Sequence, residues 1–211
     1  MAKAPRAGTV KTRLAPAFGD QRCAELQAVL TTAVTTTAAA AGDRTCVAFT
    51  PDDARAEVAT LVPPVTDLIP QRRRHLGERM SAAADHAFAA GAGRVVVVGT
   101  DAPALSRHAV RAAFAALNHT DAVIGPALDG GYYLIGMRRA SPQLFTIDPQ
   151  LWGGPSVLTA TLAQARAAGV PVVLLPADRD LDDIDDARAL RDDARVPLEV
   201  RRLLQARAVL A

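Results

Sequence analysis

Short apolar runs alternate along the chain with longer stretches in which apolar residues recur every three or four positions. The short runs are typical of strands, and the periodic stretches are typical of amphipathic helices. The clearest run is the four valines at 95–98, which lead into Gly99 and Asp101. It predicts a strand buried on both faces, the kind found in parallel sheets. Strands are expected at residues 45–49, 65–69, 95–98, 121–126, 132–137 and 170–175.

Periodic apolar residues predict helices between these strands, as Cys23, Leu26 and Leu30 do near the N-terminus. Asp52 is expected to cap one helix, and Pro155 to lie in the first turn of another. Helices are expected at residues 20–41, 52–61, 78–90, 106–117, 155–168, 183–193 and 198–209. This alternation predicts a three-layer α/β/α fold with a mostly parallel central sheet, in a single domain of residues 1–211.

The composition excludes several classes of protein. The 211 residues carry 24 basic and 22 acidic side chains and a net charge of +2, without the clustered basic face that nucleic-acid binding needs. No run approaches the roughly 18 apolar residues of a membrane span, and the N-terminus has no apolar signal core. The two cysteines lack metal-ligand spacing, so we expect a reduced, cytoplasmic protein.

Asp101 follows the valine strand, at the edge of the sheet where open α/β folds bind ligands. One interpretation is that it only caps the next helix, although Ser106 is better placed for that role. A carboxylate at the end of a buried strand is costly unless it is paired or holds a metal. Asp101 is therefore a candidate ligand for a divalent cation.

A second acidic segment lies near the C-terminus, where five acids fall within residues 180–186. Asp183 or Asp185 is expected to cap the helix that follows, because acids suit its first turn. Asp180 and Asp182 then remain at the end of another predicted strand. Together with Asp101 they would give the oxygen-only ligands that Mg²⁺ or Mn²⁺ prefers.

Residues 3–13 form a basic loop in which Lys3, Arg6, Lys11 and Arg13 flank Gly8 and Thr9. Glycine permits close backbone approach, and the cations would neutralise a di- or triphosphate. The loop is not a Walker A motif, because Val10 stands where that motif has glycine. The alternative is a solvated basic N-terminus.

The segment Asp129-Gly130-Gly131-Tyr132-Tyr133 has two interpretations. Asp-Gly between two predicted strands indicates a hairpin turn. Two glycines followed by two tyrosines also offer bare backbone and aromatic walls for a small polar ligand.

Five segments occur in order across nearly the whole chain: Lys3 to Leu14, Leu76 to Met80, Gly99 to Pro103, Gly125 to Tyr133 and Arg179 to Asp182. Together they resemble a family of bacterial nucleotide-diphospho-sugar transferases with the GT-A fold, including glycosyltransferases of the arsenosugar-biosynthesis type. The family is similar to the molybdenum-cofactor nucleotidyltransferases and to phospholactate guanylyltransferase. The motifs are specific for the fold and a nucleotide site, and less specific for the reaction.

The resemblance implies a role for each matching position. The nucleotide would be bound by Lys3, Gly8, Lys11, Arg13, Gly77 and Arg79. The metal would be bound by Asp101 and by Asp182, with Asp180 as the rival for the second place. The acceptor or transferred group would face Asp129, Gly130, Gly131 and Tyr132. Catalysis would depend on Asp101, Lys11 and Asp129.

The sequence departs from the family at its start. Members begin with a short hydrophobic strand before the Lys-Ala-Pro loop, whereas here Met1 and Ala2 directly precede Lys3. We therefore expect the first strand of the sheet to be truncated.

The resemblance implies a Mg²⁺- or Mn²⁺-dependent transferase that moves a glycosyl group from a nucleotide sugar to a small-molecule acceptor. One alternative is nucleotidyl transfer, in which a phosphorylated acceptor attacks an NTP and pyrophosphate leaves. Another is a catalytically inactive nucleotide-binding module. No nucleic acid or membrane partner is expected, and the base, sugar, acceptor and oligomeric state stay open.

Overall fold

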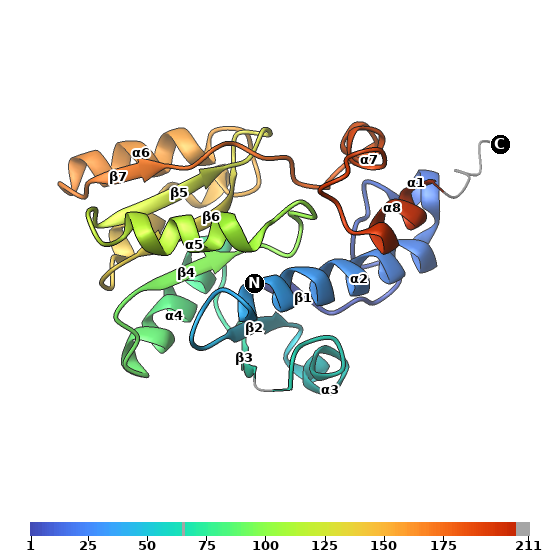
Figure 1. The fold of residues 1–211 in the computed structure, drawn as a ribbon, viewed down its shortest axis with the longest axis horizontal. Helices are drawn as coiled ribbons and strands as arrows, with labels where there is room; N and C mark the ends of the chain where they lie inside the picture. The colour runs from blue at the N-terminus through green and yellow to red at the C-terminus, as the bar shows by residue number, and fades with distance from the viewer. Residues whose placement is uncertain (65, 206–211) are drawn as a thin grey trace. The chain divides into compact units, whose positions relative to one another are not determined.

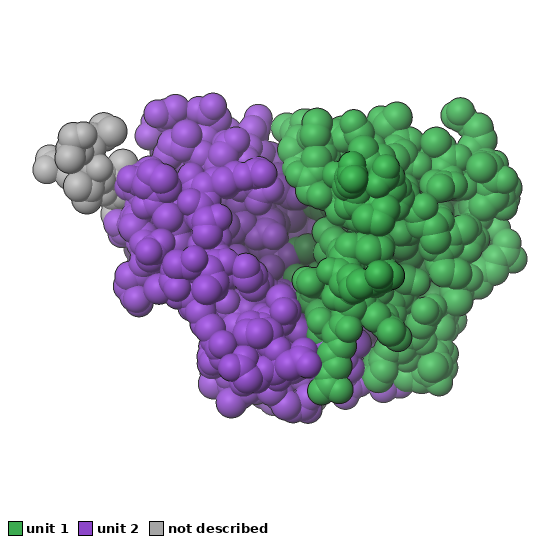
Figure 2. Space-filling view, turned by 180° about the vertical axis from the view of Figure 1, so that it is seen from behind, with its two compact units in different colours: residues 1, 71–99, 107–178 green, residues 2–70, 100–106, 179–211 purple. Residues whose placement is uncertain are grey.

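The computed structural model describes residues 1–64 and 66–205. The chain forms two compact units (Figure 2). Unit 1 contains Met1, Gln71–Gly99 and Arg107–Asp178, and unit 2 contains Ala2–Pro70, Thr100–Ser106 and the chain from Arg179 onward. The prediction of one domain stays a prediction. Parts of the elements predicted at 65–69 and 198–209 lie outside the described residues.

Unit 2 contains a three-stranded parallel sheet, in the order β1-β2-β3 (Figure 1). Its strands are β1 (Ala2–Lys3), β2 (Cys46–Thr50) and β3 (Asp67–Pro70). Strand β1 has two residues, and in it Ala2 pairs with Phe49 and Lys3 with Thr50. Lys3 was predicted in the loop and lies instead in this strand.

Unit 2 has helices in both its N-terminal and its C-terminal part. Asp52 was expected to cap a helix, and that prediction is wrong: Pro51 is the N-cap of a 3₁₀ turn that begins at Asp52 itself. The helices are α1 (Ala15–Phe18), α2 (Asp20–Ala39), η1 (Asp52–Ala54), α3 (Arg55–Ala59), α7 (Ile184–Leu190) and α8 (Leu198–Gln205).

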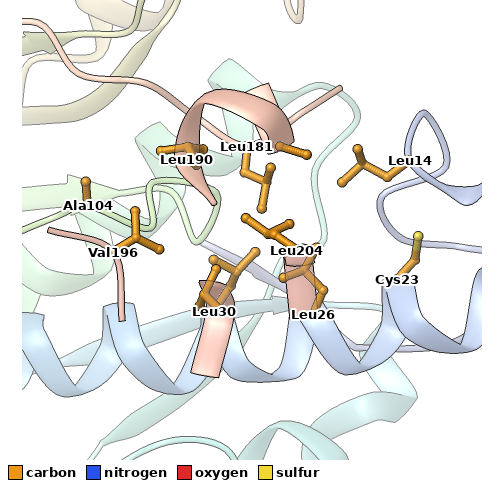
Figure 3. Packing of buried hydrophobic residues seen from close by; sticks show 11 residues of the cluster. Leu14, Cys23, Leu26, Leu30, Ala104, Leu181, Leu190, Val196 and Leu204 are labelled. Atoms are coloured by element: carbon orange, nitrogen blue, oxygen red, sulfur yellow. The ribbon is translucent and has the colours of Figure 1, made fainter. Parts of the chain in front are cut away.

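A hydrophobic core joins the N- and C-terminal parts of unit 2 (Figure 3). Leu26 and Leu30 of α2 belong to the same core as Leu181, and all three side chains are fully buried. Burial of each such side chain contributes about 1.5–3 kcal/mol. The core therefore fixes Leu181, and with it the backbone next to the acidic residues at 180 and 182. The remaining members are Leu14, Cys23, Ala104, Ala187, Leu190, Val196, Val200 and Leu204.

Unit 1 contains a four-stranded sheet in the order β4-β6-β5-β7 (Figure 1). Strand β6 runs antiparallel to β4 and β5, whereas β5 and β7 are parallel. The valine strand was predicted to be buried on both faces in a parallel setting, and this is wrong: it pairs antiparallel with β6, and only Val95 of its four residues is fully buried. The strands are β4 (Val95–Val98), β5 (Ala122–Pro126), β6 (Tyr132–Met137) and β7 (Val172–Leu174).

Helices pack around this second sheet, with α4 against β4 and α5 against both β4 and β5. Pro155 was expected in the first turn of a helix, but α6 begins at Val157 with Ser156 as its N-cap. The helices are α4 (Leu76–Ala89), α5 (Arg107–Ala116), η2 (Pro142–Phe145), η3 (Pro149–Leu151) and α6 (Val157–Ala167).

The predicted α/β class is confirmed, with helices between most successive strands and parallel pairing in both sheets. In the part of the chain that the structure describes, no helix has the length and apolarity needed to cross a membrane.

Candidate active site

The basic loop of unit 2 is a chain of tight turns. The Arg6 and Thr9 amides donate to Ala4 O and Arg6 O at 2.8 and 3.1 Å, and Gly8 has a φ of +75° that favours glycine. The Lys3 ammonium donates to Thr9 O at 2.5 Å. Lys3, predicted to bind phosphate, therefore closes the loop in this structure.

Arg6 anchors the loop to the segment that contains α3. Its guanidinium lies 2.6 Å from Glu57 and 3.1 Å from Asp53. Hydrogen bonding from Arg6 lowers the pKa of Glu57, and the two carboxylates raise the pKa of Arg6. Arg6 was one of the four cations expected to neutralise a di- or triphosphate, and in this structure it pairs with Asp53 and Glu57 and holds the loop in place.

Lys11 is the point at which the predicted residues of unit 2 meet. Its side chain is only 4% exposed, and its ammonium donates to Asp101 Oδ1 and, at 2.5 Å, to Leu181 O. The same ammonium lies 3.7 Å from Asp182 Oδ1. Lys11 also has a φ of +49°, which costs roughly 1–2 kcal/mol for a residue with a Cβ. Such strain persists where the surroundings enforce it, and it clusters at functional sites.

The two carboxylates remain open to solvent, although the ammonium between them is buried. The Asp101 and Asp182 side chains are 44% and 42% exposed. The Leu181 amide donates to Asp101 O at 2.8 Å, which ties the two acidic segments together. We call Lys11, Asp101, Asp182 and the Leu181 carbonyl the carboxylate–lysine cluster.

Asp183 is the N-cap of α7, which was one of the two caps considered from the sequence. Its carboxylate accepts hydrogen bonds from the Asp185 and Asp186 amides at 2.9 and 3.0 Å, within a capping box that Asp186 completes. The hydrogen bond from the Asp186 amide lowers the pKa of Asp183, and the charge of Arg13 lowers it further.

The cluster contains two carboxylates, the kind of ligand that Mg²⁺ takes. Among the described residues, no group of three His, Cys, Asp or Glu side chains is arranged to hold a metal. Mg²⁺ usually binds one or two carboxylates and completes its octahedral shell with water and substrate phosphates. Asp101 and Asp182 converge on one ammonium and stay about two-fifths exposed, so the cluster offers such an ion two carboxylates.

In unit 1, the segment from Ala127 to Gly131 forms the predicted hairpin turn between β5 and β6. The Ala127 amide donates to Gly131 O at 3.0 Å, and Gly130 has a φ of +91°. Asp129 is exposed, and its Oδ1 accepts a hydrogen bond from the Gly131 amide at 2.8 Å. The turn therefore fixes the orientation of the Asp129 carboxylate.

Trp152 packs against both Gly77 and Tyr132. The resemblance implies different roles for these two residues, nucleotide binding for Gly77 and contact with the acceptor or transferred group for Tyr132. A Cβ on Gly77 would lie 2.4 Å from the Trp152 ring, so glycine is needed there for packing. The Tyr132 and Trp152 rings meet edge to face at 6.5 Å. Burial raises the pKa of the Tyr132 hydroxyl, so this group stays protonated at neutral pH and cannot act as a base.

Arg79 lies in α4 and braces the preceding loop of unit 1. Its guanidinium donates to Arg73 O at 3.0 Å and to Arg74 O at 3.3 Å. Its predicted contact with a nucleotide stays a prediction.

Sequence reasoning missed three contributors to these arrangements. The Leu181 carbonyl and Trp152 had no signal in the sequence, because neither a backbone oxygen nor an isolated aromatic residue marks its neighbours. The third contributor is Gln27, whose amide nitrogen donates to Thr100 Oγ1 at 3.1 Å. It did have a signal, because it lies four residues after Cys23, on the apolar face of α2. A polar residue on a buried stripe calls for a partner.

Comparison with known proteins adds a family and a fold. Residues 31–150 match the model of DUF2064, described as an uncharacterised protein conserved in bacteria. A protein from Desulfovibrio desulfuricans G20, described as a proposed nucleotide-diphospho-sugar transferase, is 32% identical in sequence. It aligns over 96% of this chain and 90% of its own, with a TM-score of 0.87. No curated protein matches the chain.

Two further solved structures share the fold at low identity. Rv0371c from Mycobacterium tuberculosis H37Rv is 19% identical and aligns over 77% of this chain and 82% of its own, with a TM-score of 0.54. The bifunctional IspDF from Campylobacter jejuni is 9% identical and aligns over 77% of this chain and 46% of its own, also with a TM-score of 0.54. At these identities the likeness extends to the fold alone.

Proposed function

Because the chain belongs to the bacterial DUF2064 family and shares its fold with a proposed nucleotide-diphospho-sugar transferase, we propose that it is a transferase acting on a nucleotide-activated donor. The reaction we propose is glycosyl transfer from a nucleotide-diphospho-sugar to a small acceptor. The observation that carries this proposal is the carboxylate–lysine cluster, in which a buried ammonium joins the two carboxylates that the resemblance assigns to the metal.

Asp101 and Asp182 would hold Mg²⁺ or Mn²⁺ through their accessible oxygens, consistent with an ion that keeps other positions for water and phosphate. When bound, such an ion neutralises charge on the diphosphate of the donor. Asp182 is favoured over Asp180 as the second ligand because it lies 3.7 Å from the ammonium that Asp101 contacts.

Lys11 and Arg13 would stabilise the nucleoside diphosphate as it leaves. Glycosyl transfer places the departing negative charge on the phosphate oxygen that was bonded to the sugar. Cations already held at that position stabilise the transition state without reorganising. Arg13 is exposed, and its charge lowers the pKa of Asp183, the residue after Asp182, so its side chain is accessible to an anionic ligand.

In unit 1, Asp129 would accept a proton from the acceptor hydroxyl. Its carboxylate is exposed and oriented by the Gly131 amide, and a general base must lie within hydrogen-bond reach of the proton that it takes. Tyr132 would serve as an aromatic wall and not as a base, because burial keeps it protonated.

The product identifies the reaction. We expect the protein to release a nucleoside diphosphate from one nucleotide sugar in the presence of Mn²⁺, and to lose this activity in EDTA. The assay is chromatographic analysis of a panel of UDP-, GDP-, CDP- and ADP-sugars with Mn²⁺. Pyrophosphate release from an NTP and a sugar phosphate would instead establish nucleotidyl transfer. Nucleotide binding without turnover of any donor would favour an inactive binding module.

A further inference from the structure

The middle of α2 carries a buried polar side chain where its neighbours are apolar. Gln27 is 3% exposed and lies on the same helix face as Cys23 and Leu30, which belong to the core of unit 2. A buried amide is costly unless its hydrogen bonds are made. Its presence on this face therefore calls for a specific partner.

That partner is the residue directly before Asp101. The Gln27 amide nitrogen donates to Thr100 Oγ1 at 3.1 Å, and Thr100 is 4% exposed. The same nitrogen lies 3.5 Å from Thr31 Oγ1, which donates in turn to Gln27 O at 2.8 Å. The hydrogen bond to Thr100 joins residues 73 positions apart, so it links α2 to the segment that carries Asp101.

We infer that Gln27 is a positioning residue, which holds Thr100 so that the Asp101 carboxylate keeps its place in the carboxylate–lysine cluster. The effect on metal binding rests on the proposed function, whereas the effect on the Asp101 segment does not. On one side of Asp101, the Leu181 amide fixes its carbonyl. On the other side, Gln27 fixes Thr100. Asp101 is thus held on one side through its own carbonyl and on the other through the side chain of Thr100, while its carboxylate stays 44% exposed to a ligand.

The energetic argument separates positioning from simple stability. Removing one partner of a buried hydrogen bond leaves the other unsatisfied, whereas replacing both partners with apolar groups of similar shape is nearly neutral. Gln27→Met and Thr100→Val are such replacements. The double variant should therefore recover stability that either single variant loses, but it has no hydrogen bond to hold the segment.

The experiment compares the two single variants, the double variant and Thr35→Val. Thr35 is buried on the same helix, and its hydroxyl donates within α2, to Thr31 O at 2.7 Å. Amide hydrogen exchange of residues 100–105 is measured on the metal-free proteins, with melting temperature and Mn²⁺ affinity measured in parallel. Thr100→Ser, which retains the hydroxyl, should behave like the parent.

We expect the double variant to have a melting temperature near that of the parent and faster amide exchange at residues 100–105. We also expect it to bind Mn²⁺ about tenfold more weakly, because mutation of residues that support metal ligands typically lowers metal affinity by that factor or more. Thr35→Val should change neither exchange nor affinity. Unchanged exchange in the double variant would overturn the inference, as would Mn²⁺ affinity that recovers together with the melting temperature. Absence of Mn²⁺ binding in the parent would refute the metal site of the proposed function, and the exchange rates would still decide the role of Gln27.

Discussion

Replacing Lys11 with methionine is expected to lower kcat about 10²–10³-fold while the protein stays folded. The ammonium is the buried positive charge that touches Asp101 and the Leu181 carbonyl. Methionine keeps an unbranched side chain and removes only the charge and its hydrogen bonds. The carboxylates are about two-fifths exposed, so water can solvate them in the variant and the loss of stability should be small.

The measurement is kcat at saturating nucleotide sugar and Mn²⁺, with circular dichroism and Mn²⁺ titration as checks on folding and metal binding. Because Lys11 and the ion would share Asp101, the variant should bind Mn²⁺ at least as tightly as the parent. Lys3→Met should lose less activity, since that exposed lysine donates to a loop carbonyl. A Lys11→Met enzyme with kcat within a few-fold of the parent would contradict the catalytic role of the ammonium.

Replacing Gly130 with alanine is expected to destabilise the protein by about 2–5 kcal/mol. A left-handed backbone costs a residue with a Cβ about 1–2 kcal/mol, and here φ is +91°. The new Cβ would also lie 2.0 Å from Pro155 O, and overpacking of this kind costs about 1–3 kcal/mol more. For a chain of this size the melting temperature should fall by roughly 10 °C.

Alanine variants of two other glycines, compared by thermal or urea unfolding, separate the cost of the left-handed backbone from the cost of the close contact. Gly153 has a φ of +83° and open space around it, so Gly153→Ala should show the backbone cost alone. At Gly131 a Cβ would meet only the Asp129 carboxylate, at 3.2 Å, and that side chain can move. If Gly130→Ala loses no more stability than Gly153→Ala, the contact between the turn and Pro155 is not as tight as the structure shows.

The sequence predicted the elements well where a periodic or continuous apolar pattern has clear ends. The segment from Tyr132 to Met137 is a strand with the predicted bounds, and α2 begins at Asp20 as expected. In both cases burial decides the structure, and burial is recorded directly in the order of apolar residues.

Strand pairing was harder to predict than strand position. The four valines show that a strand prefers an apolar environment, but they do not record which strand lies beside it. Strand β6 returns antiparallel after the turn at Asp129, and it pairs with β4 as well as with β5. The sequence signalled the turn, whereas the second pairing depends on the tertiary fold.

The sequence indicated which charged residues belong to the candidate site, but it did not indicate which atoms they contact. Lys11, Asp101 and Asp182 are far apart in sequence, and they meet in unit 2 as the motifs implied. The left-handed backbone of Lys11 and the carbonyl of Leu181 leave no trace in residue type. Gln27 was visible as a polar residue on an apolar face, but its partner was not.

The central claim is that Asp101 belongs to a metal-dependent nucleotide site. The most direct test is the melting temperature of the parent and of Asp101→Asn with nucleoside diphosphates and their sugar conjugates, each with and without Mn²⁺. A ligand that binds the folded state raises the melting temperature by mass action. We predict that one such nucleotide stabilises the parent only when Mn²⁺ is present, and that Asp101→Asn loses this stabilisation. Equal stabilisation of both proteins, or none that depends on Mn²⁺, would contradict the claim.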